Sequence, residues 1–159
     1  MKDKITTILK RERDPSVRFE VLEKFYSLVD CEDDVRFIIN VLQSDVDPCV
    51  RHEAAAQLFR IEEKKPDLMV NLKGQTITAL LDKAFNDESI VVRHESIEAL
   101  GYIGDEHSLP SLEQLSRDSN LDIRSTAEIA FHTAERRIKD GVSASDLTAH
   151  IIENWTPES

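Results

Sequence analysis

Asp47-Pro-Cys-Val-Arg51 is one of four copies of a short phrase in this sequence of 159 residues. The other copies are Asp14-Pro-Ser-Val-Arg18, Ser89-Ile-Val-Val-Arg93 and Asn120-Leu-Asp-Ile-Arg124. From one arginine to the next the intervals are 33, 42 and 31 residues. A unit of this length that recurs along a chain is typical of solenoid proteins, in which each unit buries its apolar face only against its neighbours.

Each phrase has the features of a helix N-terminus. Its first residue is Asp, Ser or Asn, whose side-chain oxygen can accept a hydrogen bond from a free N–H group of the first turn. In two copies Pro15 or Pro48 follows at the first helical position, where its missing N–H costs nothing. After each helix start, four positions recur in every copy at steps of four, four and three residues. We call these positions columns and predict that they form one buried stripe along the helix. The columns are Val17, Val21, Phe25 and Leu28; Val50, Ala54, Leu58 and Ile61; Val92, Ser96, Leu100 and Ile103; and Ile123, Ala127, Phe131 and Ala134.

A second apolar segment lies upstream of each phrase, within residues 5–9, 35–42, 77–85 and 109–115. The sequence therefore predicts one all-α domain over residues 1–159, a right-handed α-solenoid or superhelix of about four helix pairs. We expect the pairs at about residues 3–29, 33–62, 75–104 and 108–139. A further helix over 143–155, with Leu147, Ile151 and Trp155 four residues apart, is predicted to cap the last pair.

The 42-residue interval indicates an insertion, which we place within Glu62–Gln75. Pro66 and Gly74 predict a loop there. We expect a surface excursion rather than a binding lip.

Composition excludes several classes of function. With 20 Lys and Arg against 31 Asp and Glu, the net charge of −11 disfavours nucleic acid as a partner and DNA-binding repair as a function. Cys31 and Cys49 lack the spacing of a zinc site or a disulfide framework and are expected to be reduced thiols. No apolar run has the length of a membrane span, so we expect a cytoplasmic protein with no membrane partner.

The residues that are candidates for metal binding or catalysis come directly after the repeated arginine. The second and third copies continue with His52-Glu53 and His94-Glu95, whereas the first has Phe19-Glu20 and the fourth has Ser125-Thr126. Packed helices lie about 8–10 Å apart, so equivalent positions on neighbouring helices can face a shared space. Two His and one carboxylate with open positions are the ligand pattern of non-haem iron(II) sites. The alternative is that these are solvated polar residues on the inner face of the superhelix, and the residues alone leave both interpretations open.

Other catalytic patterns are absent from the sequence. The segment after His52 lacks the second His of the HExxH pattern, which argues against a zinc protease. No GxGxxG, GxxxxGK[ST] or GxSxG occurs, which argues against nucleotide binding and hydrolase chemistry.

The stretch Val92-Arg-His-Glu-Ser-Ile-Glu-Ala-Leu-Gly-Tyr-Ile-Gly-Asp105, with 109–115 and 123–138, resembles the HEAT-like repeats of deoxyhypusine hydroxylase. It is also similar to the repeats of phycobilisome lyase subunits. Residues 14–138 are similar in layout to one half of the hydroxylase, with His-Glu in the second and third of four repeats.

The resemblance to the hydroxylase implies a di-iron monooxygenase built from two facing halves. Carried over by motif, it implies that His52, His94 and Glu95 bind non-haem iron. Glu53 would orient a cationic, polyamine-like substrate or support the ligand shell. Because the chain supplies one half, the resemblance implies a homodimer or a second, similar chain.

The alternative function is a scaffold without enzymatic activity or cofactor, which binds a protein partner as in phycobilisome lyase subunits. Extended concave surfaces of solenoids suit such partners. The sequence therefore predicts a protein-interaction module and leaves open whether it is also an enzyme.

Overall fold

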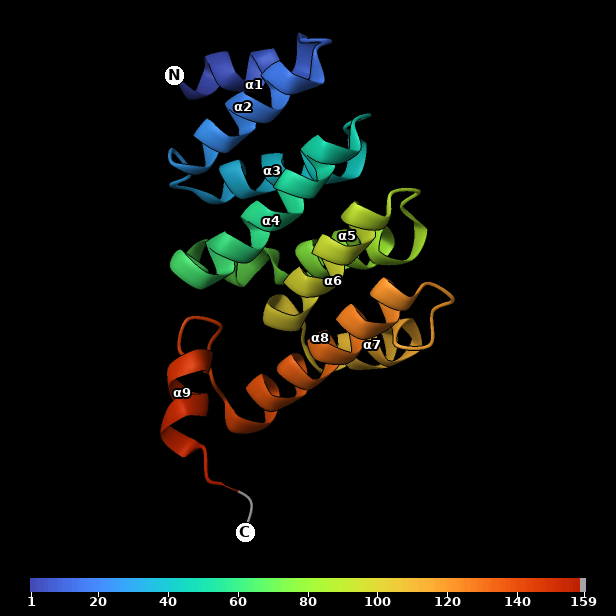
Figure 1. Ribbon diagram of the computed structural model, residues 1–159. Helices are drawn as coiled ribbons and strands as arrows, with labels where there is room; N and C mark the ends of the chain where they lie inside the picture. The colour runs from blue at the N-terminus through green and yellow to red at the C-terminus, as the bar shows by residue number, and fades with distance from the viewer. Residues whose placement is uncertain (158–159) are drawn as a thin grey trace.

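A computed structural model of the chain describes residues 1–157 and has helices and no strand in that range (Figure 1). Eight of the helices form successive pairs: α1 (Lys2–Arg11) with α2 (Pro15–Tyr26), α3 (Glu32–Ser44) with α4 (Pro48–Lys64), α5 (Lys73–Asn86) with α6 (Ile90–Ile103), and α7 (Leu109–Leu115) with α8 (Leu121–Asp140). A short helix, α9 (Leu147–Asn154), follows the last pair. The predicted all-α solenoid is confirmed.

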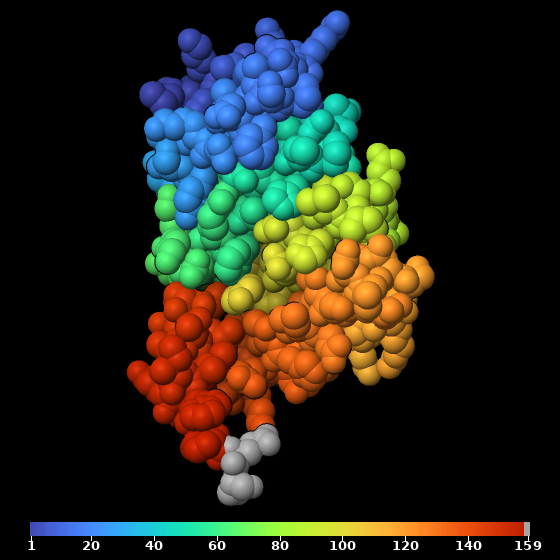
Figure 2. All heavy atoms as spheres, in the orientation of Figure 1, coloured from blue at the N-terminus to red at the C-terminus, as the bar shows by residue number. Residues whose placement is uncertain are grey.

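The helix pairs stack in chain order. Each even-numbered helix packs against the next even-numbered helix, and α3 also packs against α5. In the space-filling view the colours succeed one another as layers from the N-terminal to the C-terminal end (Figure 2). The apolar core therefore runs through the stack as one continuous cluster instead of forming a central globule.

The helix starts follow the predicted capping in three of four copies. Asp14 accepts a hydrogen bond from the Ser16 N–H at 2.9 Å, and Asp47 accepts one from the Cys49 N–H at 2.8 Å. Asn120 caps α8 in the same way. The prediction is wrong at Ser89, whose side chain makes no capping bond.

The predicted core stripe is best formed in the interior of the stack. All four columns of the second and third copies are fully or almost fully buried, namely Val50, Ala54, Leu58, Ile61, Val92, Ser96, Leu100 and Ile103. In the first copy Val17 is 38% exposed and Val21 is only partly buried. The first pair has a neighbour on one side only, so part of its stripe stays at the surface.

The repeated arginine joins each pair to the next. The Arg51 guanidinium donates two hydrogen bonds of 2.9 Å to the carboxylate of Asp87, in the turn before α6. Arg18 binds Asp45 in the same bidentate manner at 3.0 Å, and Arg93 pairs with Asp118. The arginine column is therefore a ladder of ion pairs between repeats, a role that the sequence analysis did not assign.

The insertion is packed rather than looped out. α4 continues to Lys64, two short 3₁₀ helices cover Pro66–Leu68 and Val70–Leu72, and α5 begins at Lys73. Met69 and Leu72 are fully buried. The segment lies at the surface as predicted, but the predicted loop ends early, because α5 already contains Gly74, and Met69 and Leu72 hold the segment against the core.

The C-terminal helix is shorter than predicted. α9 begins at Leu147, after a turn over 143–146. Trp155 lies just beyond the helix end in extended backbone and is 70% exposed, so most of its surface is not packed against the last pair. Ala144 and Leu147 are the residues of this segment that are buried. Within residues 1–157 no helix combines the length and the apolar character needed to cross a membrane.

Close packing of α6 on α8 gives a testable prediction at Gly101. A Cβ atom at this position would lie 3.1 Å from the Ala130 Cα, so a larger side chain must push the two helices apart. We expect Gly101→Leu to lower the free energy of unfolding by about 1–3 kcal/mol in urea titrations. Gly74→Ala is the matched control: nothing lies within 4 Å of its Cβ, and we expect a gain of about 0.5–1 kcal/mol. Equal stability of wild type and Gly101→Leu would contradict this packing.

Candidate metal site

The second and third repeats bring one predicted His–Glu couple together. His52, on α4, and Glu95, on α6, approach to 3.2 Å between Nε2 and Oε2. Two ligand atoms at right angles on an ion, each bonded at about 2.1 Å, lie about 3 Å apart. The couple therefore has the spacing of two adjacent metal ligands supplied by neighbouring helices.

His94 is held in a second couple. Its Nδ1 lies 2.9 Å from the Thr126 hydroxyl on α8, and its Nε2 lies 3.3 Å from Oε1 of Glu98, one turn further along α6. The ring of His94 is thus not directed at the couple of His52 and Glu95. For all three predicted ligands to share an ion, the His94 ring must leave Glu98 and turn toward them.

One group of three metal-binding side chains with ligand atoms within 4.8 Å of one another occurs in residues 1–157, and it lies elsewhere. It consists of Asp30, Cys31 and Asp34. The ammonium group of Lys2 donates hydrogen bonds to both of these aspartates. That cluster already holds a cation from the chain itself, so we do not take it as the metal site.

The charge around His52 favours a cation. The hydrogen bond with Glu95 raises the pKa of His52 above its usual value, although burial acts in the opposite direction. The negative charges of Glu95, Glu53 and Glu98 raise it further. Both imidazoles remain partly exposed, so an ion or a substrate can reach them. The imidazoles of His52 and His94 and the carboxylates of Glu95 and Glu98 fit a non-haem iron ion in donor type and charge.

Glu53 lies deeper than the other predicted site residues. Its carboxylate is buried and accepts hydrogen bonds from Gln57, at 2.9 Å, and from Arg60. Gln57 also donates to the Leu22 carbonyl oxygen on α2 at 2.7 Å. Arg60 already neutralises the charge of Glu53. This arrangement suits a role in supporting the ligand shell better than the alternative role of orienting a cationic substrate.

The sequence analysis missed Glu98 and Thr126. Glu98 could have been found, because a side chain four residues after His94 lies on the same helix face. Thr126 follows Arg124 at the offset at which Glu95 follows Arg93. Glu95 and Thr126 each contact the His of the preceding repeat. The same contact therefore recurs in successive repeats, as His52 with Glu95 and as His94 with Thr126.

Comparison with known proteins identifies the family of this chain. Curated relatives include deoxyhypusine hydroxylase of Cryptococcus neoformans, 34% identical over 65% of this chain and 27% of that protein. The hydroxylase of Candida albicans is 48% identical over 29% of this chain and 15% of that protein. The matches thus span about a quarter or less of these relatives' own length.

Among solved structures, human deoxyhypusine hydroxylase in complex with glycerol superposes with a TM-score of 0.70 and 25% identity. The match covers 89% of this chain and 46% of the human one, so the chain is similar to about one half of that enzyme.

A family model described as HEAT repeats matches residues 35–132, which is more than half of the chain. This range contains α4 and α6, the helices that carry the His–Glu couples, and most of α8, which carries Thr126. The chain belongs to the HEAT-repeat family.

Proposed function

We propose that this protein binds non-haem iron through His52, His94 and Glu95 and forms one half of a two-chain, hydroxylase-like assembly. The observation that carries the proposal is the 3.2 Å approach of His52 to Glu95 across two repeats. The relatives named deoxyhypusine hydroxylase support it, because that family uses iron held by HEAT-like repeats.

Within the proposed site, each of the chain's residues has a separate role. His52 and Glu95 are spaced as a ready pair of ligands, while His94 can swing from Glu98 and supply the third. Glu98 then remains as a free carboxylate at the partly exposed edge, where it can bind a cationic group of a substrate. Bound iron would supply activation of molecular oxygen.

A second chain is part of the proposal, since this chain matches only 46% of the human hydroxylase. The facing half would be another copy of this chain or a similar protein. The net charge of −11 adds to the attraction for a cationic, polyamine-like substrate.

The test is to load the purified protein anaerobically with iron(II), remove unbound metal, and measure iron per chain together with the mass in solution. We expect about one iron per chain and the mass of a dimer. Protein that elutes with no more iron than the buffer blank contradicts the metal site. A monomer that retains iron contradicts the two-copy assembly.

The contact between Thr126 and His94 gives a finer prediction. Hydrogen bonds to the second ring nitrogen commonly fix the orientation of a metal-binding His, and losing one costs about 10–100-fold in affinity. The proposed turn of His94 frees Nε2 from Glu98 and keeps Nδ1 at the Thr126 hydroxyl, so we expect Thr126→Val to weaken metal binding by about tenfold in a competition titration with a chelator. Thr126→Ser keeps the hydroxyl and should restore the affinity; equal affinities in all three proteins would contradict the role.

We also propose a second function, binding of a protein partner, which is compatible with the first. Each even-numbered helix in the stack packs on the next, an arrangement that gives solenoids extended binding surfaces. Both cysteines are free and exposed, as expected in a reducing compartment such as the cytoplasm. Isotope-quantified capture from native lysate, with a charge-matched unrelated protein as control, tests this function; identical captured sets would contradict it.

A further inference from the structure

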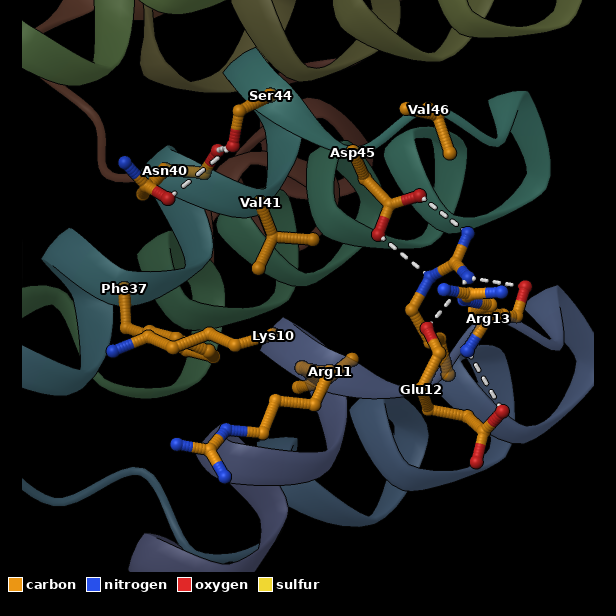
Figure 3. Close-up of a pocket in the computed structure, with 12 residues that line it drawn as sticks. Lys10, Arg11, Glu12, Arg13, Phe37, Asn40, Val41, Ser44, Asp45 and Val46 are labelled. Carbon is orange, nitrogen blue, oxygen red and sulfur yellow. Dashed lines mark hydrogen bonds and ion pairs between the residues drawn. The ribbon is translucent and has the colours of Figure 1, made fainter.

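A groove of about 490 Å³ lies at the N-terminal end of the solenoid, away from the His–Glu couples (Figure 3). It is bounded by the C-terminal ends of α1 and α3 and by the turns that follow them. Leu9, Phe37 and Val41 provide an apolar floor, and Val46, which is 84% exposed, provides an apolar edge.

Three of the four cations that line this groove lack acidic partners. Lys10, Arg11 and Arg13 are exposed, and none of them pairs with a carboxylate within residues 1–157. The ammonium of Lys10 lies 5.9 Å from the centre of the Phe37 ring.

The two acids at the groove are engaged in other contacts. Asp45 binds the buried Arg18, so these two charges cancel. Glu12 accepts hydrogen bonds from the backbone N–H groups of Arg13 and Asp14, and it offsets one of the three cations. The groove is therefore positive in a chain of net charge −11.

We propose that this groove binds an acidic peptide segment of a partner protein, with an apolar side chain placed between its carboxylates. Such a ligand matches both properties of the surface, the apolar floor and the free cations. Complementary charge of this kind contributes mainly to specificity and to the rate of association.

The layout favours an extended ligand over a compact anion. The three cations lie along the wall formed by the end of α1 and the turn after it, with Lys10 and Arg11 toward one end and Arg13 toward the other (Figure 3). The carbonyl ends of α1 and α3 also border the groove, and helix C-termini carry partial negative charge that disfavours a compact dianion. An extended peptide can space its carboxylates around these ends.

The experiment uses fluorescence anisotropy with the full chain and a labelled nonapeptide of sequence EELEFEELE. We expect saturable binding that weakens with added salt. The neutral peptide QQLQFQQLQ should bind at least about tenfold more weakly, because it lacks the charges that the three cations attract. Excess inorganic phosphate should not displace the acidic peptide beyond the effect of the same ionic strength of chloride.

Two variants locate the site. The triple change Lys10→Glu, Arg11→Glu and Arg13→Glu should weaken binding about tenfold or more, and Val46→Ser should weaken it by roughly threefold. A matched control is Lys4→Glu, Arg136→Glu and Lys139→Glu, which makes the same change in net charge away from the groove and should leave the affinity within about twofold. Circular dichroism verifies the fold of each variant.

Three results would overturn the proposal. They are absence of peptide binding, an equal loss of affinity in the groove variant and the control variant, and displacement by phosphate alone, which would indicate a compact-anion site. None of these outcomes depends on iron, so this test is independent of the proposed metal function.

Discussion

Arg51→Leu is expected to lower the free energy of unfolding by about 3 kcal/mol, because the buried carboxylate of Asp87 loses both guanidinium hydrogen bonds and keeps only Lys83, at 3.8 Å, as a cationic neighbour. Both side chains of this pair are almost fully buried, and the guanidinium also donates to the Asp45 carbonyl oxygen. The pair joins the second repeat to the third, between which the His52–Glu95 couple is formed. Urea unfolding followed by circular dichroism measures the loss.

The chain supplies its own control for this change. Arg124 occupies the same position in the last repeat, but in the described part of the chain its recorded hydrogen bonds go to the carbonyl oxygens of Asp118 and Ser119. Arg124→Leu leaves no buried carboxylate unpaired, so we expect a cost below about 1.5 kcal/mol. Equal destabilisation by the two substitutions would show that the ladder does not hold the repeats together.

The same pair gives the pH dependence of this effect. Burial alone would raise the pKa of Asp87, but the bonds from Arg51 and from the Ser89 N–H outweigh it and hold the pKa below its usual value. A carboxyl group with a lowered folded-state pKa stabilises the fold above its unfolded pKa of about 3.9, and this contribution is lost as pH falls through the folded value. In Arg51→Leu burial instead raises the folded-state pKa of Asp87, so the difference in stability between wild type and variant should be full above that raised pKa and shrink as pH falls toward the lowered pKa of wild type.

The double variant His52→Ala, His94→Ala is expected to lose its bound iron almost completely. Two of the three proposed ligands disappear, and Glu95 alone cannot compete with water and buffer for the ion. Elemental analysis after anaerobic loading measures the effect, with thermal unfolding as a check that the variant is folded.

Two other histidines serve as the control. His107 and His132 lie outside the couples, at the exposed surface. The variant His107→Ala, His132→Ala should keep the iron content of wild type. If the two double variants hold the same amount of iron, the metal is bound adventitiously and the site is elsewhere.

The fold was predictable because its signals are local and repeated. Capping residues, Pro at the helix start and apolar columns act within one helix, and four copies reinforce one another. Apart from the missing cap at Ser89, the errors arose where a single segment has no copy to compare. The insertion was read from Pro66 and Gly74, but burial of Met69 decided its path. Trp155 fitted a helical spacing, yet the helix ends before it.

The candidate site was predictable only in part. The register of the repeats predicts that His52 and Glu95 meet, and they do. The orientation of His94 depends on Thr126, which contacts its Nδ1, and on Glu98, which contacts its Nε2. The burial of Glu53 depends on Arg60 and Gln57 of the same helix. Such choices among rotamers are settled by packing between helices, which the sequence pattern does not specify.

The most direct test of the metal site is a crystal structure of the iron-loaded protein, with an anomalous difference map recorded at the iron edge. The account predicts a peak within bonding distance of His52 Nε2, a Glu95 carboxylate oxygen and a ring nitrogen of His94, with the His94 ring turned away from Glu98. A peak at Asp30 and Asp34 instead, or no peak near the His–Glu couples, would contradict it.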